Sequence, residues 1–294
     1  MRTTAIPVPR EFNFDFCRDY LKRSPHENLH RVVDHSVTKL LSLNGSDFIV
    51  RISGGETRHI RVEYLYGQPS PTTQKMICDY VSAWFDLSTD LRPFYRLAKQ
   101  DDLLSPLIKK FYGHRIVGHL DLFESLIWAV LGQQINLSFA HKLKSRLVES
   151  FGRSLTVDGH VYYAFPTPSV ISKLDLGQLA ALQLSRQKSA YVVGIAQAFE
   201  DGQLSQQGLS QLSFEDAKDK LMTIKGIGNW TANYVLMKTL RFPNAFVLED
   251  AGLHNAIKHQ LGLKTKPSLD RMKRIFRKYR GWEAYATAYL WKSL

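Results

Sequence analysis

The chain has 294 residues, enough for about two domains of roughly 100 to 200 residues, each with a full hydrophobic core. Hydrophobic residues make up 44% and charged residues 22% of it, and no apolar run is long enough to cross a membrane as a helix, so membrane insertion is set aside. The net charge of +12 and the pI near 9.6 indicate a polyanionic partner, with nucleic acid as the first candidate.

The N-terminus, MRTTAIPVPREF, has no apolar segment after its arginine and therefore lacks the pattern of a secretory signal. Only two cysteines, Cys17 and Cys78, are present, too few for a four-cysteine zinc or iron–sulfur site. We expect a cytoplasmic protein in which both cysteines are free thiols.

Strand and turn signals dominate the first part of the chain. The segment FNFDFCRDYLKR fits either a helix or an extended segment, and this choice stays open. After it, SVTKLLSL, FIVRIS and HIRVEYLY are separated by the turn pairs Asn44-Gly45 and Gly54-Gly55, which predicts an antiparallel meander. Residues 72–85 then have helical periodicity, so residues 1–97 are predicted to form an α+β domain.

The rest of the chain, residues 98–294, has mainly helical periodicity, and its one further strand candidate is VYYAF at 161–165. We predict an all-α region, with the domain boundary within residues 95–100. The predicted helices share apolar residues at spacings of three and four, and they are DLFESLIWAVLG, SFAHKLKSRLVESFG, SVISKLDLGQLAAL, QKSAYVVGIAQAFEDG and FEDAKDKLMTI.

The turn Lys225-Gly226-Ile227-Gly228 lies between two helical segments. A dinucleotide-binding loop would follow a strand and would have a third glycine where Thr231 stands. Helix, glycine turn and helix are instead typical of a helix-hairpin-helix, whose backbone N–H groups hold a phosphate oxygen without reading the bases. Taken alone, the turn fits a plain connection between packed helices equally well.

Three residues near this turn bear on its role. Trp230 and Tyr234 share one face of the second helix, where they either stack on a base or fill the core. Asp250 precedes another helical pattern and is a natural N-cap. A helix N-terminus also favours an ionised carboxylate by roughly 0.3 to 1 kcal/mol. A carboxylate fixed there is suited to stabilising the oxocarbenium-like sugar formed when a glycosidic bond breaks.

These segments resemble the helix-hairpin-helix superfamily of DNA glycosylases, and within it the AlkA-type DNA-3-methyladenine glycosylases II. The resemblance is carried by IKGIGNWTANYVL, FVLED and WEAYATAYLW, and upstream by LGQQI and FPTPSVISKL. It covers nearly the whole chain. It implies that the N-terminal α+β domain, an antiparallel sheet with helices, is similar to the TATA-binding protein, and that the helical region contains the catalytic cleft.

The resemblance also assigns roles to single residues. Asp250 matches the catalytic aspartate. The aromatic residues matched to the base pocket are Trp230, Tyr234, Trp291 and Tyr20. The residues matched to DNA contacts are Gly226, Ile227, Gly228, Lys225 and Thr231 of the hairpin, with Gln133 and Gln134 of the LGQQI segment. No cofactor is required, and the main-chain carbonyls matched to a structural Na⁺ or K⁺ site are those of Met222, Ile224 and Ile227.

Three positions differ from related proteins. Lyases of the superfamily have a Schiff-base lysine where Trp230 stands, so the resemblance implies a monofunctional enzyme with water as nucleophile. Ala251 replaces a tyrosine of the AlkA type, which leaves the lesion spectrum open. Gln134 aligns with an apolar wedge that fills the gap left by the flipped nucleotide.

The expected function is base excision repair of duplex DNA by a monomer associated with the bacterial nucleoid. The enzyme would flip out an alkylated purine, such as 3-methyladenine or 7-methylguanine, and hydrolyse its N-glycosidic bond to leave an abasic site. Aromatic side chains would favour a positively charged base. Two alternatives are kept: a bifunctional glycosylase/lyase for oxidised purines, and a non-catalytic helix-hairpin-helix protein that binds DNA.

Overall fold

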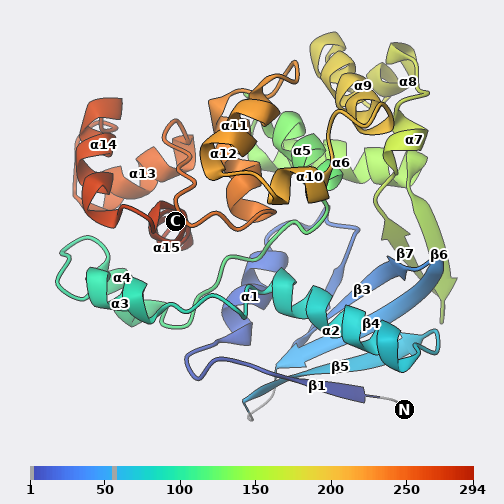
Figure 1. Cartoon of the computed structure of the whole chain (residues 1–294), viewed down its shortest axis with the longest axis horizontal. Helices are drawn as coiled ribbons and strands as arrows, with labels where there is room; N and C mark the ends of the chain where they lie inside the picture. Colours follow the sequence, from blue (N-terminus) through green and yellow to red (C-terminus); the bar gives the residue numbers. More distant parts are fainter. Residues whose placement is uncertain (1–2, 55–57) are drawn as a thin grey trace.

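The computed structural model describes residues 3–54 and 58–294. Its N-terminal part is a five-stranded antiparallel sheet with strand order β1-β5-β4-β3-β2 (Figure 1). The strands are β1 (Thr3–Pro7), β2 (Arg31–Val33), β3 (Ser36–Leu43), β4 (Ser46–Gly54) and β5 (His59–Tyr66).

The predicted meander of β3, β4 and β5 is confirmed. Asn44 and Gly45 have φ of 51° and 75°, the left-handed conformation that a two-residue hairpin turn requires. The second predicted turn pair, Gly54-Gly55, lies partly outside the described residues, because Gly54 ends β4 and Gly55 is not described. The short edge strands β1 and β2 were not predicted.

The segment left open between helix and strand forms a helix, α1 (Phe14–Leu21), which packs on the sheet together with α2 (Pro71–Trp84). Asn13 caps α1 through its side-chain oxygen, which accepts from the N–H of Asp15 at 2.9 Å. The helix buries Phe14, Cys17 and Leu21, which recur at spacings of three and four, and so presents one apolar face to the sheet.

The remainder is helical except for one hairpin. Its elements are α3 (Arg92–Ala98), α4 (Ser105–Lys110), α5 (Leu122–Gly132), α6 (Leu137–Phe151), β6 (Arg153–Val157), β7 (His160–Ala164), α7 (Pro168–Ile171), α8 (Leu176–Ala181), α9 (Arg186–Glu200), α10 (Gln206–Ser210), α11 (Phe214–Met222), α12 (Asn229–Lys238), α13 (Ala251–Gln260), α14 (Leu269–Phe276), a 3₁₀ turn (Arg277–Tyr279) and α15 (Glu283–Lys292).

The helical region also contains an antiparallel hairpin of β6 and β7 at residues 153–164. The strand candidate VYYAF at 161–165 corresponds to β7, whereas β6 was not predicted. Their turn is Asp158-Gly159, with φ of 50° and 72°, and this Asp-Gly pair is the strand signal that the sequence contained. Leu155 and Tyr162 of the hairpin pack with residues of β3 and β4 on the sheet face opposite α1 and α2. The hairpin therefore covers part of the second face of the sheet, over β3, β4 and β5.

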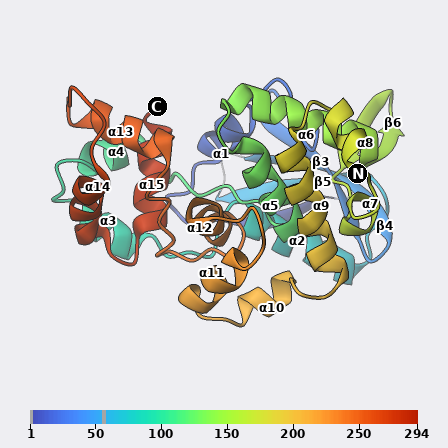
Figure 2. The same cartoon turned by 90° about the horizontal axis from the view of Figure 1, so that it is seen from above.

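The helical region has its own core, centred on α5 and α12. Every residue from Leu122 to Leu131 except Glu124 is buried, as is every residue from Thr231 to Lys238. Figure 2 shows α12 between a group formed by α3, α4, α13, α14 and α15 and the helices around α5. Leu91, at the start of α3, already belongs to this core. The boundary within residues 95–100 stays a prediction.

Buried charges fasten the N-terminal domain to the helices. Arg115, which has no exposed surface, donates to the carbonyl oxygen of Asp86 at 2.8 Å and to the carboxylate of Glu11 at 2.8 Å. Lys144 of α6 contacts the Glu27 carboxylate at 2.8 Å. These contacts join Glu11 and Glu27, which flank α1 in the sequence, to the helical region. Among the described residues, no helix has both the length and the apolar character needed to span a membrane.

Candidate active site

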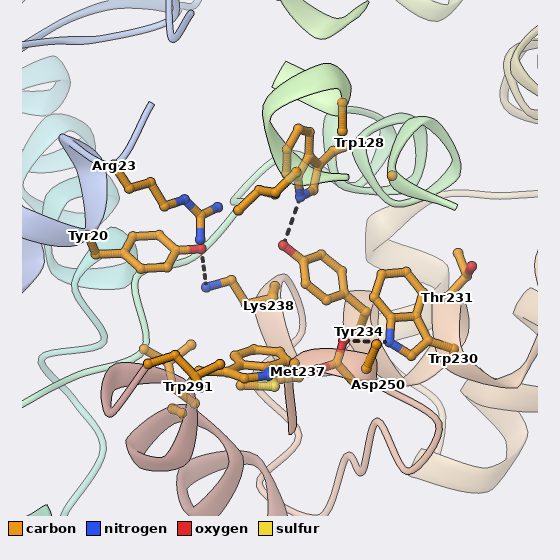
Figure 3. A pocket seen from close by; sticks show the side chains of 18 of the residues that line it. Tyr20, Arg23, Trp128, Trp230, Thr231, Tyr234, Met237, Lys238, Asp250 and Trp291 are labelled. Carbon is orange, nitrogen blue, oxygen red and sulfur yellow. Dashed lines mark hydrogen bonds between the residues drawn. The ribbon is translucent and has the colours of Figure 1, made fainter. Parts of the chain in front are cut away.

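A cavity of about 1340 Å³ opens between α1, α12, the segment that joins α5 to α6, and the N-terminus of α13 (Figure 3). All five residues predicted for catalysis and for the base pocket line it: Tyr20, Trp230, Tyr234, Asp250 and Trp291. They come from α1, α12, α13 and α15, which are far apart in the sequence. The structure thus brings the predicted pocket residues together.

Asp250 is held by three N–H donors. As the N-cap of α13, it accepts the backbone N–H of Leu253 on Oδ1 at 2.6 Å. The same oxygen accepts the indole N–H of Trp291 at 2.8 Å, and Oδ2 accepts that of Trp230 at 3.1 Å. The predicted N-cap is therefore present. The two indole donors were not predicted, because spacing along a helix does not show where an indole N–H points.

An aromatic wall beside Asp250 is formed by Trp230, Tyr234 and Trp291, whose rings contact one another. The rings of Trp230 and Tyr234 stack with centroids 5.2 Å apart, and those of Tyr234 and Trp291 are tilted with centroids 6.4 Å apart. Trp128 of α5 donates its indole N–H to the Tyr234 hydroxyl at 2.9 Å. Burial raises the pKa of Tyr234, so its hydroxyl stays protonated.

Behind this wall lies a second layer of buried polar groups. His119 Nε2 is 3.4 Å from the Tyr234 hydroxyl, and its ring stacks on Trp128 at 6.2 Å. Burial lowers the pKa of His119 to about 4, which keeps the ring neutral near pH 7. Burial opposes ionisation of Glu124, but His119 and Lys144 outweigh it and lower the pKa of that carboxyl to about 2. Buried polar groups therefore support the aromatic wall from behind, outside the lining of the cavity.

The wall facing Asp250 carries two cations around Tyr20. Lys238 Nζ donates to the Tyr20 hydroxyl at 3.0 Å, and the Arg23 guanidinium lies over the Tyr20 ring at 4.0 Å. Burial opposes ionisation of Tyr20, but Arg23 and Lys238 outweigh it and lower its pKa to about 8. Burial also lowers the pKa of Lys238. Arg23 and Lys238 were not predicted as site residues.

The glycine turn is a tight hairpin between α11 and α12. Gly226 has φ of 95°, and a Cβ built on it would lie 2.4 Å from the Tyr191 ring. Lys225 and Gly228 are exposed, whereas Ile227 is buried at 4% exposure. Gly228 is the N-cap of α12, so the first N–H groups of that helix lie next to the turn.

The two glutamines of the LGQQI segment differ in their surroundings. The side-chain amide of Gln133 donates to the carbonyl of Gly226 at 2.9 Å and to the hydroxyl of Thr231 at 3.1 Å. Gln133 therefore braces the hairpin, and the Thr231 side chain is buried beneath it. Gln134 is exposed, lines the cavity and has φ of 57°, in the left-handed region that only a minority of residues other than glycine adopt.

Among the described residues, no group of three or more His, Cys, Asp or Glu side chains is arranged to hold a metal ion. Main-chain oxygens are a separate case. In the hairpin, the Ile224 carbonyl accepts the N–H of Ile227 at 3.1 Å, which leaves one of its two lone pairs. Carbonyl oxygens of this kind suit a hard cation.

Comparison with known proteins gives a consistent result. Residues 127–280 match the HhH-GPD superfamily of base excision DNA repair proteins, and residues 17–126 match the 8-oxoguanine DNA glycosylase N-terminal domain. A DNA-3-methyladenine glycosylase of Bacillus subtilis is 40% identical over 99% of this chain and 96% of its own length.

Two solved structures extend the comparison. A 3-methyladenine DNA glycosylase from Archaeoglobus fulgidus has the same fold, with a TM-score of 0.83 at 24% identity over 99% of this chain and 97% of its own. The Schizosaccharomyces pombe 3-methyladenine DNA glycosylase Mag1, solved with abasic DNA, has a TM-score of 0.58 at 25% identity over 67% of this chain and 93% of its own.

The hairpin geometry predicts unequal effects of two glycine substitutions. Gly226→Ala should lower the free energy of unfolding by about 1–3 kcal/mol, because a left-handed residue gains a Cβ that collides with Tyr191. Gly228→Ala, with φ of −93° and open space around its Cβ, should cost less than about 1 kcal/mol. Urea unfolding of both variants measures the difference, and equal losses would contradict this account of the turn.

Proposed function

Because the chain belongs to the HhH-GPD superfamily of base excision DNA repair proteins and is a DNA glycosylase of that superfamily, we propose that it excises alkylated purines from duplex DNA. The proposal names 3-methyladenine and 7-methylguanine as substrates. The observation that carries it is the Asp250 carboxylate, fixed at the edge of an aromatic pocket by Trp230 and Trp291. The full-length similarity to the Bacillus subtilis enzyme supports the same substrate class.

DNA is held mainly through its phosphates. The exposed turn at Lys225 and Gly228 offers backbone N–H groups and one ammonium to a phosphate oxygen. The basic segment at 258–280 adds long-range attraction. Gln134, exposed at the rim, fills the gap when the damaged nucleotide rotates out, at a cost of a few kcal/mol.

The resemblance to the helix-hairpin-helix DNA glycosylases leads us to propose also that Na⁺ or K⁺ binds at the hairpin. The carbonyl oxygens of Met222, Ile224 and Ile227 would hold it, and Ile227 is buried, which keeps this part of the turn rigid. A bound cation would add positive charge where a phosphate approaches.

The pocket selects a base through its aromatic side chains. Trp230 and Tyr234 stack on each other and, with Trp291, form an electron-rich wall next to Asp250. A purine methylated at N3 or N7 carries positive charge, which cation–π attraction favours by about 0.5 to 2 kcal/mol. Such a base leaves readily, because it departs as a neutral molecule.

Asp250 acts on the sugar. As the bond between C1′ and the base nitrogen breaks, its electron pair leaves with the base, and the nearby carboxylate stabilises the sugar cation. Water then bonds to C1′ and loses a proton, which leaves an abasic site. The two indole N–H groups keep the carboxylate oriented by donating hydrogen bonds to it, and they transfer no proton to it. No covalent intermediate with the protein is formed.

Asp250→Asn tests this mechanism. The variant should keep its fold, because asparagine is an equally good N-cap, and should bind DNA as the wild type does. Release of 3-methyladenine and 7-methylguanine from alkylated DNA should fall by at least about 100-fold, because the sugar cation loses its counter-charge. Asp270→Asn, in the exposed first turn of α14, is the matched control and should release both bases normally. Near-normal release by Asp250→Asn would rule out the proposed role of this carboxylate.

Trp291→Phe tests the positioning of Asp250 separately from stacking. The variant keeps an aromatic ring but loses the N–H that holds Oδ1, so the single-turnover rate should fall by about 10-fold. Affinity for an abasic-analogue duplex should change little. Trp282→Phe is the control, because Trp282 packs on Phe94 away from the cavity. A purely structural role of Trp291 would weaken binding and rate together.

The monofunctional assignment predicts the result of borohydride trapping on an abasic duplex. The wild type should give no covalent protein–DNA adduct, because Trp230 stands where lyases of the superfamily carry lysine. Trp230→Lys places an amine beside Asp250 and is expected to gain the adduct. A trapped wild-type adduct would favour the bifunctional alternative for oxidised purines.

A further inference from the structure

Lys188 of α9 binds the C-terminal end of α5, the helix beside it in Figure 2. Its Nζ donates to the carbonyl oxygen of Leu131 at 2.6 Å. Leu131 lies in the last turn of α5, where carbonyl oxygens lack partners within the helix and the helix dipole favours a cation. Leu131 is fully buried, so water competes weakly for this contact. The ammonium therefore fixes the point at which the chain leaves α5 and enters the α5–α6 loop, residues 132–136.

Gln134 stands between two further anchors of this loop. On one side, the side-chain amide of Gln133 donates to the carbonyl of Gly226 at 2.9 Å. On the other, the Asn136 side chain caps α6 by accepting the N–H of Phe139 at 2.8 Å. Gln134 itself is exposed and has φ of 57°. A residue other than glycine keeps this conformation where the surrounding contacts impose it. The anchored loop therefore sets the backbone of Gln134.

The same face of α9 supports the glycine turn. Tyr191 lies three residues after Lys188 and packs its ring on Gly226, where an added Cβ would be 2.4 Å from the ring. The Tyr191 hydroxyl accepts the side-chain amide of Gln187 at 2.7 Å, which fixes the direction of the ring. Helix α9 thus contacts both the turn and the α5–α6 loop, and Gln133 joins these two segments to each other.

Resting on the proposed function, and in particular on the proposed role of Gln134, we propose that Lys188 is a positioning residue for base flipping. By holding the end of α5, Lys188 sets the place at which Gln134 enters the gap left by the flipped nucleotide. It acts through the α5–α6 loop and does not contact DNA itself.

The physical reason is preorganisation. A loop that became ordered only on DNA would lose conformational entropy at that moment, and this loss would weaken gap filling. The hairpin binds a phosphate, so a loop already joined to the hairpin brings Gln134 to a fixed distance from that phosphate. Loss of the Lys188 contact frees one end of the loop, while the hairpin keeps its packing on Tyr191.

The ratio of two affinities measures gap filling separately from phosphate binding. One duplex carries a tetrahydrofuran abasic analogue, and the other has the same sequence with an intact nucleotide. Hairpin contacts count in both, whereas Gln134 fills a gap only in the first. Lys188→Met should lower the preference for the abasic-analogue duplex by about 3- to 10-fold, the effect of losing one hydrogen bond.

Two control variants accompany Lys188→Met. Lys188→Arg keeps a cationic donor at the end of α5 and should retain most of the preference. Lys173→Met removes the same charge from an exposed lysine and should retain all of it. Thermal melting establishes that each variant folds.

The double variant Lys188→Met/Gln134→Ala shows whether Lys188 acts through Gln134. Gln134→Ala alone should lower the preference, and adding Lys188→Met should lower it no further, because both residues serve one contact. Losses that multiply would overturn the inference, as would an equal loss on both duplexes or an unchanged preference in Lys188→Met. An unchanged preference in Gln134→Ala would overturn it together with the role of Gln134. These affinities do not depend on catalysis, whereas the proposed function fails only if the wild type releases no 3-methyladenine from alkylated DNA.

Discussion

The site depends on one carboxylate held by three helices. Asp250 caps α13, and its two oxygens accept indole N–H groups from Trp230 on α12 and Trp291 on α15. A carboxylate near a cavity would otherwise rotate and take its hydrogen bonds from water. Three directed donors leave it one orientation, so its charge is already in place when a sugar cation forms. The packing of α12, α13 and α15 around the helical core therefore serves the geometry of this single group.

The pocket is electrically asymmetric across the space that a base would occupy. Asp250 supplies negative charge at one wall, whereas Lys238 and Arg23 supply positive charge at the other, around Tyr20. Glycosidic cleavage separates charge in the same sense, with the sugar becoming positive and a neutral leaving base becoming negative. Fixed charges of this kind are worth more in a cavity that excludes water than at a surface. The aromatic wall between the two ends contributes stacking and no formal charge.

The structural features that were predicted correctly from the sequence follow from local rules. The Asn44-Gly45 turn, the glycine hairpin and the Asp250 N-cap each follow from the conformation or hydrogen bonding of a few adjacent residues. Strands β1 and β2 were missed because they are short and lie at the sheet edges, where tertiary pairing decides. Lys238 was missed for another reason. Helix α12 is buried on every side from Thr231 onward, so no polar face separates a solvated lysine from a buried one.

The buried contacts between the two parts of the chain make the N-terminal domain a component of the site. Tyr20 belongs to α1 and Lys238 to α12, so their hydrogen bond crosses from the sheet domain to the helical core. The length of this hydrogen bond depends on the position of α1 relative to the helices. Arg115 and the Lys144–Glu27 pair fix that position by buried polar contacts. Charges buried in this way tolerate little displacement, because a shift leaves them unpaired in a medium of low dielectric constant. The wall that faces Asp250 is thus only as rigid as the junction of the two domains, and a substitution at that junction would act on the base pocket without touching it.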